Sequence, residues 1–468
     1  MVPSSLRRGR VKARNIFIGF VAFLLLGIGL VNLHALSYLT NHCATSSPNP
    51  RSPNEIHQLQ ERSTTTTTTT TTPKEEEEKK DTTISEDDKD DYLKLKSIQQ
   101  TLMGLYESLP EPRVKDDDNG RLHMNYRELS NLYTRQRFVE VQDITLVTHG
   151  SVSKLPMLIE QMVRWEGPIS FVIYLQSTND IQVFCEFLRD NGTTQFLNNT
   201  SIHAVLEKHG GTLPYPVNVL RNLAQRSIES NFFLLMDVDF LPSKGAYAYL
   251  MQTLQNTEHP FWDQLRNNTV FVLPAFERFP LLPNGTATAD LVPEYKLELK
   301  QMLKQQVAST FHPYFPPGHQ PTDYDLWLDD GLDTEFSYPI QYVKRFEPYV
   351  IAYKRGLPEF WDGFRGFGYN AATFFWELHL AGYQYRVIRR QFVVHMNHPG
   401  RNERAIQDGS IAKLQLRRFL RYVSRKYDLN QTELRYWKGR RYGDGTHVTH
   451  IACAHCDKAA AAMQNAAN

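Results

Sequence analysis

The chain has 468 residues, enough for one large domain with additional segments at its ends. Its formal net charge of +1 lacks the strong basic excess of most nucleic-acid-binding proteins, so we expect no nucleic-acid partner. Four cysteines are too few for a disulfide framework. Cys453 and Cys456 form a lone C-x-x-C pair without the second ligand pair of a zinc site, so a local disulfide or no role is the simpler interpretation.

The first predicted element is an apolar stretch at residues 16–39, preceded by five basic residues between positions 7 and 14. Its length approaches the ~20 residues needed to span a bilayer, and the basic cluster predicts a cytoplasmic N-terminus. We therefore expect a cytoplasmic tail at 1–15, a signal anchor at 16–39 and a lumenal remainder. A cleaved signal peptide is the alternative. Sequons at Asn191, Asn198, Asn199, Asn267, Asn284 and Asn430 agree with lumenal exposure.

Residues 40–135 are predicted to form a lumenal stalk that is largely disordered. They include a threonine run at 64–72, then Pro73 and a run of lysine and glutamate. This composition buries too little apolar surface to offset the entropy lost on ordering, and is typical of an O-glycosylated stalk. Within it, residues 91–109 have leucines at helical spacing, which predicts a short stem helix or a self-association segment.

Residues 136–450 are predicted to be the catalytic domain, followed by a disordered tail at 451–468. The apolar patterns predict strands at 144–148, 169–175, 201–205, 231–236 and 269–273. They predict helices at 155–165, 181–189 and 218–230. This alternation indicates an α/β domain with a largely parallel sheet. Residues 274–398 are rich in aromatic residues and less regular, as expected of an acceptor-binding region, and a basic helix is predicted at 416–426.

The strand at 231–236 ends in two carboxylates, Asp237 and Asp239. Ligands of α/β sheets bind at the carboxyl ends of the strands, and residues two apart in an extended chain point the same way. The pair could therefore hold one hard cation, and with it a diphosphate. This D-x-D arrangement is typical of glycosyltransferases that use nucleotide sugars, although two aspartates after a strand are often only a solvated turn.

An ordered set of short stretches resembles glycosyltransferase family 49, which contains the glucuronyltransferase domain of LARGE and a β-1,4-glucuronyltransferase. The stretches are 165–170, 215–224, 235–242, 272–277, 317–324, 346–350, 364–370 and 394–398. The resemblance implies a GT-A fold (a Rossmann-like mixed sheet flanked by helices), transfer with inversion, and a divalent metal. Because no second transferase domain precedes the stalk, we do not expect this chain to polymerise a disaccharide repeat alone.

The resemblance implies Asp237, Asp239 and His395 as metal ligands. Carboxylates suit Mn²⁺ or Mg²⁺, and a histidine favours Mn²⁺. An ordinary packed histidine is the alternative for His395. The nucleotide of the UDP-sugar is predicted to contact Arg221 and Asn222, which lie on the helix before the D-x-D strand. Further predicted contacts are Thr148 and His149, which follow the first strand, and His398, which faces the diphosphate.

Inverting transfer needs a base for the acceptor hydroxyl. Asp323, Asp362 and Glu377 are the predicted catalytic acids, with Glu347 a fourth acid in the matched stretches, and the sequence does not choose among them. At 358–364 the spacing of acids differs from that of relatives, which puts the role of Asp362 in doubt. A predicted aromatic platform for a sugar ring, or alternatively ordinary core packing, is formed by Trp327, Trp361 and Tyr369.

The predicted function is transfer of glucuronic acid from UDP-glucuronic acid to a protein-linked glycan, by a single-pass type II Golgi membrane protein. The alternatives are another UDP-sugar, such as N-acetylglucosamine or xylose, and an inactive carbohydrate-binding homologue. We also expect the protein to form a homodimer or a complex with other Golgi transferases.

Overall fold

The computed structural model describes residues 86–110, 115–116, 122–123, 126–134, 139–190, 197–208, 214–256, 258–278, 292–332, 334–366, 368–396, 409–430 and 434. The predicted anchor at 16–39 and the predicted tail at 451–468 lie outside these residues. Among the helices that the structure describes, none is long and apolar enough to cross a membrane. The described residues all lie within one compact unit, which begins at residue 83.

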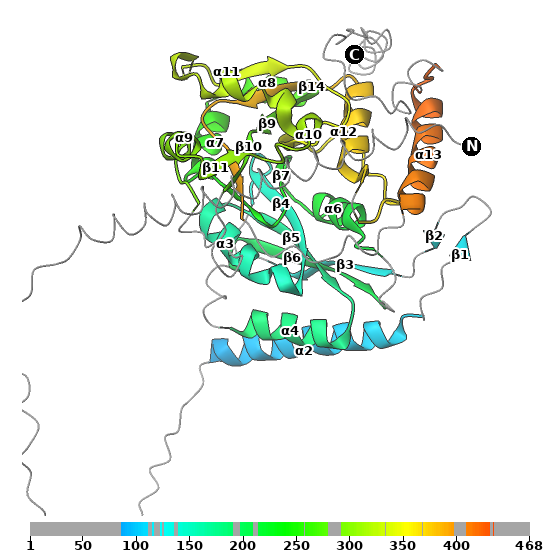
Figure 1. Cartoon of the computed structure of the whole chain (residues 1–468). Coiled ribbons are helices and arrows are strands. Elements are labelled where there is room, and N and C mark those ends of the chain that lie inside the picture. Colours follow the sequence, from blue (N-terminus) through cyan, green and yellow to red (C-terminus); the bar gives the residue numbers. More distant parts are fainter. Residues whose placement is uncertain are drawn as a thin grey trace, which may run out of the picture. The chain divides into compact units, whose positions relative to one another are not determined.

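A nine-stranded sheet is the centre of this unit, with strand order β12-β14-β9-β13-β7-β4-β5-β6-β3 (Figure 1). Its strands are β3 (Tyr126–Tyr133), β4 (Ile144–Ser151), β5 (Ile169–Leu175), β6 (Thr200–Glu207), β7 (Phe232–Leu235), β9 (Thr269–Leu273), β12 (Ser337–Ile340), β13 (Tyr349–Tyr353) and β14 (Gln384–Ile388). The neighbours β7, β4, β5 and β6 are parallel, whereas β3 and β13 run antiparallel to their partners. The sheet is therefore mixed, which confirms the predicted α/β class.

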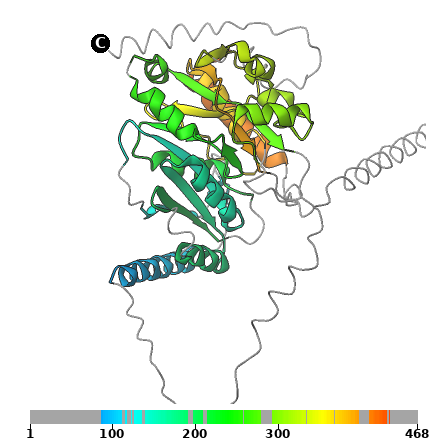
Figure 2. The ribbon, with the colours of Figure 1, turned by 90° about the vertical axis from the view of Figure 1, so that its left-hand side faces the viewer.

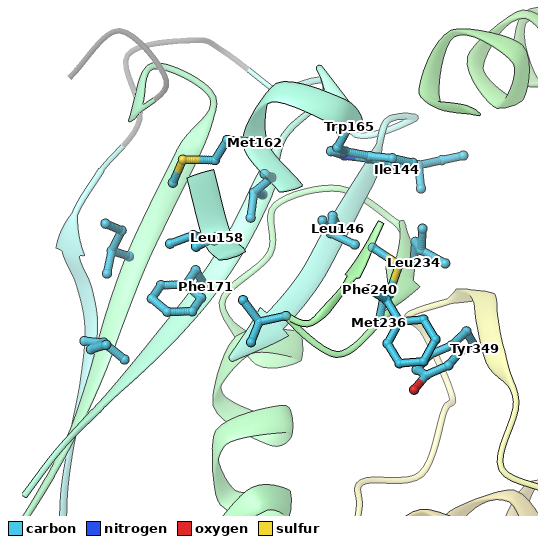
Figure 3. Packing of buried hydrophobic residues seen from close by; sticks show 14 of the residues in the cluster. Ile144, Leu146, Leu158, Met162, Trp165, Phe171, Leu234, Met236, Phe240 and Tyr349 are labelled. Atoms are coloured by element: carbon cyan, nitrogen blue, oxygen red, sulfur yellow. The ribbon is translucent and has the colours of Figure 1, made fainter. Parts of the chain in front are cut away.

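Helices cover both faces of the sheet. The helices between its first strands are α3 (Leu155–Trp165), α4 (Thr178–Arg189) and α6 (Val217–Arg226). On one face, side chains of α3 and α4 join the sheet in a single buried cluster; Figure 3 shows Leu158 and Met162 of α3 next to Phe171 of β5. On the other face, α6 packs in a second cluster, where Leu220 and Leu223 are buried. Strands β5 and β7 are buried along their whole length, and β4 is buried as far as Gly150, because both faces of these strands are covered.

A second, four-stranded sheet has the order β11-β10-β15-β8. Its strands are β8 (Phe240–Pro242), β10 (Ala275–Arg278), β11 (Ala308–Thr310) and β15 (Val393–His395). Strand β7 of the large sheet ends at Leu235 and β8 of the small sheet begins at Phe240. The chain between them, which carries both aspartates of the D-x-D motif, therefore joins the two sheets.

The folded part begins before residue 136, contrary to the predicted end of the stalk. Helix α2 (Glu86–Ser108) lies alongside α4 in both views of the ribbon (Figure 2), and its Leu102 is fully buried in the cluster beneath the sheet. Strand β3 forms the edge of the large sheet, antiparallel to β6. Both elements lie in the predicted stalk, and their apolar side chains complete the core of the folded unit.

The remaining helices and turns complete the described part of the chain. The helices are α7 (Ala246–Gln255), α8 (Phe261–Arg266), α9 (Lys296–Lys304), α10 (Pro316–His319), α11 (Tyr324–Leu328), α12 (Asn370–Leu380) and α13 (Gly409–Lys426). Short 3-10 turns occur at Val152–Lys154, Gln320–Thr322 and Asp330–Leu332, and β1 (Lys115–Asp116) pairs with β2 (Leu122–His123). Helix α13 packs on α12 through a third cluster that includes Trp376 and Phe419.

Candidate active site

The two aspartates lie at the carboxyl edge of the large sheet, where β7 ends. Asp237 follows β7, and Asp239 lies directly before β8. Strand β8 pairs antiparallel with β15, with Phe240 opposite His395. The backbone N–H of Met396 also donates to the carbonyl of Asp239 at 2.7 Å. These pairings bring His395 beside Asp239, and its Nε2 lies 3.9 Å from Oδ2 of Asp239.

Asp237 is fixed by two donors from other elements. Nη2 of Arg221 on α6 donates to Oδ1 at 3.1 Å, and the hydroxyl of Tyr349 on β13 donates to Oδ2 at 3.1 Å. Arg221 is itself held by Oδ1 of Asn370, at 3.0 Å from its Nη1, and by Oδ1 of Asn218 at 3.3 Å. Arg221, which was predicted to contact the nucleotide, is thus a buried arginine that orients the first aspartate of the motif.

Asp239 faces a lysine as well as the histidine. Nζ of Lys154, which follows β4, donates to its Oδ2 at 3.2 Å. Within the described ranges, no three His, Cys, Asp or Glu side chains gather closely enough to hold a metal ion. The pair Asp239 and His395 nevertheless fits a Mg²⁺ or Mn²⁺ site that the oxygens of a bound diphosphate complete, since such ions often take only one or two protein ligands. Lys154 places a positive charge where such an ion would lie.

Two buried polar atoms at the end of β4 fit a ligand. In the part of the chain that the structure describes, Oγ1 of Thr148 and Nε2 of His149 have no hydrogen-bond partner. Nδ1 of His149 shares a hydrogen bond of 2.9 Å with the hydroxyl of Tyr215, and Nε2 lies 3.9 Å from Oδ1 of Asp237. Burial, and secondly Arg221, lowers the pKa of His149 to about 4, so the ring is neutral at neutral pH.

Two further residues, Asn222 and His398, were predicted to contact the nucleotide. Asn222 exchanges hydrogen bonds with the backbone of Phe360: its Nδ2 donates to the carbonyl at 2.8 Å, and its Oδ1 accepts from the N–H at 2.9 Å. Asn222 therefore anchors the loop before α12 to α6. His398 lies outside the described residues.

The three predicted catalytic acids occupy other parts of the domain. Asp323 is exposed and caps α11, accepting from the N–H of Leu326 at 3.2 Å. Glu377 on α12 is buried and accepts from Nζ of Lys426 on α13 at 2.8 Å. Asp362 is exposed and, with Glu377, lines a cavity of about 250 Å³ between β3, α6 and α13. The structure does not bring these acids to the two aspartates.

The three residues of the predicted aromatic platform do not form a common surface. Trp327 is fully buried between Phe276 and Phe392, and its Nε1 donates to the carbonyl of Ile388 at 2.9 Å, so it belongs to the core. Trp361 packs on α13, and Tyr369 precedes α12.

Several residues were not assigned to the site from the sequence. Lys154 and Tyr349 contact the two aspartates, and Asn370 contacts Arg221, because the elements that carry them pack around the motif. Glu347 is part of the same surroundings, since burial, and to a smaller extent the nearby Asp237, raises its pKa to about 7. Glu277 of β10 lies opposite His395 in the parallel pair β10–β15. Strand register, which the sequence does not reveal, determines these positions.

Comparisons with known proteins identify the family of the chain. The family described as "Glycosyl-transferase for dystroglycan" matches residues 143–210 and 190–428. Xylosyl- and glucuronyltransferase LARGE2s of Danio rerio is 33% identical over 259 residues, 55% of this chain and 32% of the relative. Human LARGE1, also named a xylosyl- and glucuronyltransferase, is 31% identical over 269 residues, 57% of this chain and 32% of the relative. The chain thus spans about a third of the length of these relatives.

Among solved structures, Staphylococcus aureus TarS 1-349 in complex with UDP-GlcNAc matches with a TM-score of 0.33 and 12% identity, covering 63% of this chain and 70% of that chain. This similarity is too low to bear on the fold or the function. The family match is different in kind, because it spans more than half of the chain and includes the D-x-D segment, Arg221 and His395. The chain belongs to glycosyltransferase family 49.

Proposed function

We propose that this protein is a metal-dependent, inverting glycosyltransferase of the GT-A type. In this proposal it transfers glucuronic acid from UDP-glucuronic acid to a protein-linked glycan. The observation that carries the proposal is the arrangement at the edge of the sheet. Asp239 and His395 are 3.9 Å apart, beside an Asp237 that Arg221 orients and near two buried polar atoms without partners.

Each of these residues has a role in the proposed reaction. Asp239 and His395 would hold the divalent ion, which when bound supplies charge stabilisation to the leaving diphosphate. Lys154 adds a positive charge on the same side. Thr148 and the neutral His149 would bind the uridine, with Nε2 of His149 as the polar atom that a nucleotide completes.

The donor sugar is the least constrained part of the proposal. The relatives are named xylosyl- and glucuronyltransferases, so both sugars are candidates, and N-acetylglucosamine is a further alternative. An inactive carbohydrate-binding homologue is the alternative from another class of protein. The presence of Asp237, Asp239 and His395 together supports an active enzyme.

A panel of UDP-sugars tests the proposal directly. The purified protein is incubated with each donor and Mn²⁺, with and without glycan acceptors, and the released UDP is measured. We expect turnover with UDP-glucuronic acid that chelation of the metal abolishes. Asp325→Asn, an exposed substitution on α11, should leave this turnover unchanged. Turnover with a different UDP-sugar would correct the donor, and no turnover with any donor would favour the inactive homologue.

We further propose a single-pass type II Golgi membrane protein with a lumenal catalytic domain, a membrane anchor at 16–39 and a stalk that is shorter than the sequence predicts. A homodimer or a complex with other Golgi transferases is part of the same proposal. Protease protection of the domain in sealed vesicles is the measurement that checks this topology.

A further inference from the structure

Glu347 lies beside the D-x-D segment because of strand register. Strand β13 runs antiparallel to β7, with Val350 opposite Leu235. Continuing this register past the end of β7 brings Glu347 next to the residues that follow the strand. Tyr349, two positions further along, donates to Asp237. The carboxyl group of Glu347 interacts electrostatically with Arg221 and Asp237, so its side chain faces the candidate active site.

The N-terminus of α12 holds this carboxylate in place. The residue before α12, Tyr369, provides no side-chain cap. The carboxylate of Glu347 instead accepts a hydrogen bond from the N–H of Ala372, in the first turn of the helix. The backbone N–H of Glu347 donates to the carbonyl of Gly318 at 2.9 Å. Both ends of the residue are thus fixed relative to the site.

Charged groups from three elements surround the carboxyl group. Arg221 on α6 and Arg345 on its own segment favour the ionised form, and Asp237 after β7 disfavours it. Burial is the largest effect, and together these groups raise the pKa of Glu347 to about 7. A base of this strength is suited to proton transfer at neutral pH, because it is both deprotonated and able to take up a proton.

We propose that Glu347 is the catalytic base of the glycosyl transfer, an inference that rests on the proposed function. The acceptor hydroxyl gives its proton to the carboxylate of Glu347 as its oxygen bonds to the anomeric carbon of the donor. The bond between that carbon and the diphosphate oxygen breaks, and its electron pair leaves with UDP. One bond forms and one breaks on opposite sides of the carbon, so the configuration is inverted.

Glu347→Gln tests this role with little change in shape, since its amide oxygen still accepts from Ala372. We expect kcat to fall by about 10²–10⁴-fold, with little change in the KM for the donor. UDP binding in the presence of Mn²⁺, measured by calorimetry, should be retained. Glu186→Gln, an exposed substitution on α4, is the matched control and should behave as the wild type. Wild-type kcat in the Glu347→Gln variant would overturn the inference.

The pH dependence separates a base from a simple helix cap. At saturating metal and donor, the wild-type kcat should rise with pH, because only the deprotonated carboxylate acts as a base. Glu347→Asp should keep this rise at a lower kcat, whereas Glu347→Gln should lose it. If Glu347 only caps α12, Glu347→Gln keeps the rise. That result would overturn the inference, as would a flat wild-type profile.

Glu277 is the competing acid, because it lies opposite His395. If Glu277→Gln abolishes turnover while Glu347→Gln does not, the base is Glu277 and the inference is wrong. Failure of the proposed function has a different signature, since the wild-type protein would then transfer no sugar from any UDP-sugar.

Discussion

Asp237 and Asp239 differ in their partners, although they lie two positions apart. Asp237 is bound by Arg221 and Tyr349, so its carboxylate is oriented by the large sheet and the helix behind it. Asp239 faces Lys154 and His395, which are both on the diphosphate side of the proposed site. We infer that the first aspartate organises the site and that the second is the main protein ligand of the metal.

Substitution of the second aspartate and of the histidine tests this division. Asp239→Asn should reduce turnover severely, because several kcal/mol of transition-state stabilisation come from the metal. His395→Ala should raise the Mn²⁺ concentration needed for half-maximal activity. Both side chains are partly exposed, so the melting temperature should change little. An unchanged Mn²⁺ titration in His395→Ala, together with a lower melting temperature, would make His395 an ordinary packed side chain.

His319 gives the fold an acid-sensitive point. It is buried between the rings of Phe311 and Tyr349, and burial lowers its pKa to about 3. As the pH falls below about 6.5, the unfolded chain takes up a proton that the folded chain refuses until about pH 3. The contribution of His319 to stability is therefore complete above pH 6.5 and decreases as the pH falls through this window.

Replacement of His319 by phenylalanine should reduce this acid sensitivity. Between pH 7 and pH 5, the free energy of unfolding of the wild type should fall by about 2 kcal/mol more than that of His319→Phe. Urea denaturation at the two pH values measures the difference. Equal losses in the two proteins would show that His319 is already protonated in the folded state, or exposed.

At the scale of elements, α2 is the least expected part of the domain. Its sequence predicts a stem helix or a self-association segment, yet its apolar side chains pack against α4 and the core cluster. Leu102 is fully buried, whereas Leu93 on the same helix is 59% exposed. Helical spacing indicates that the leucines form one face, but it does not reveal what that face covers.

Truncations and two substitutions test the role of α2. A chain that begins at residue 83 should fold and remain active, whereas one that begins at 119 should aggregate, because the surface of α4 loses its cover. Leu102→Ala should lower the free energy of unfolding by about 2–5 kcal/mol. Leu93→Ala should change it by less than about 0.5 kcal/mol. If the chain that begins at residue 119 is stable and active, α2 is part of the stalk and not of the folded domain.

At the scale of the whole molecule, local patterns predicted several elements of the first half of the domain. Helix α3 and strands β5 and β9 have the predicted bounds, because each is a continuous or regularly spaced apolar segment. The strands of the second half could not be predicted from such patterns. Strand β13 is a short apolar segment between aromatic loops, and nothing in it indicates that it separates β7 from β9 in the sheet.

The residues of the site likewise divide into those that local patterns predicted and those that they did not. Asp237 and Asp239 were predicted from the strand before them, and Arg221 from the helix before that strand. His395 required the resemblance, since only the pairing of β8 with β15 brings it to Asp239. Tyr349 and Glu347 depend on the register of β13 and could not be assigned a place. Local periodicity cannot predict which residues of a strand distant in the sequence will lie at a site.

The link between the two sheets has a consequence for the newly made chain. Asp239 lies directly before β8 of the small sheet, and its partner His395 lies on β15, the last of the strands that the structure describes. During synthesis the strands proposed to bind the nucleotide therefore emerge long before the proposed metal pair is complete. A ribosome-bound or prematurely terminated fragment would lack half of this pair, so it would be poorly equipped to activate and waste the sugar donor. Catalytic competence thus arrives late in translation.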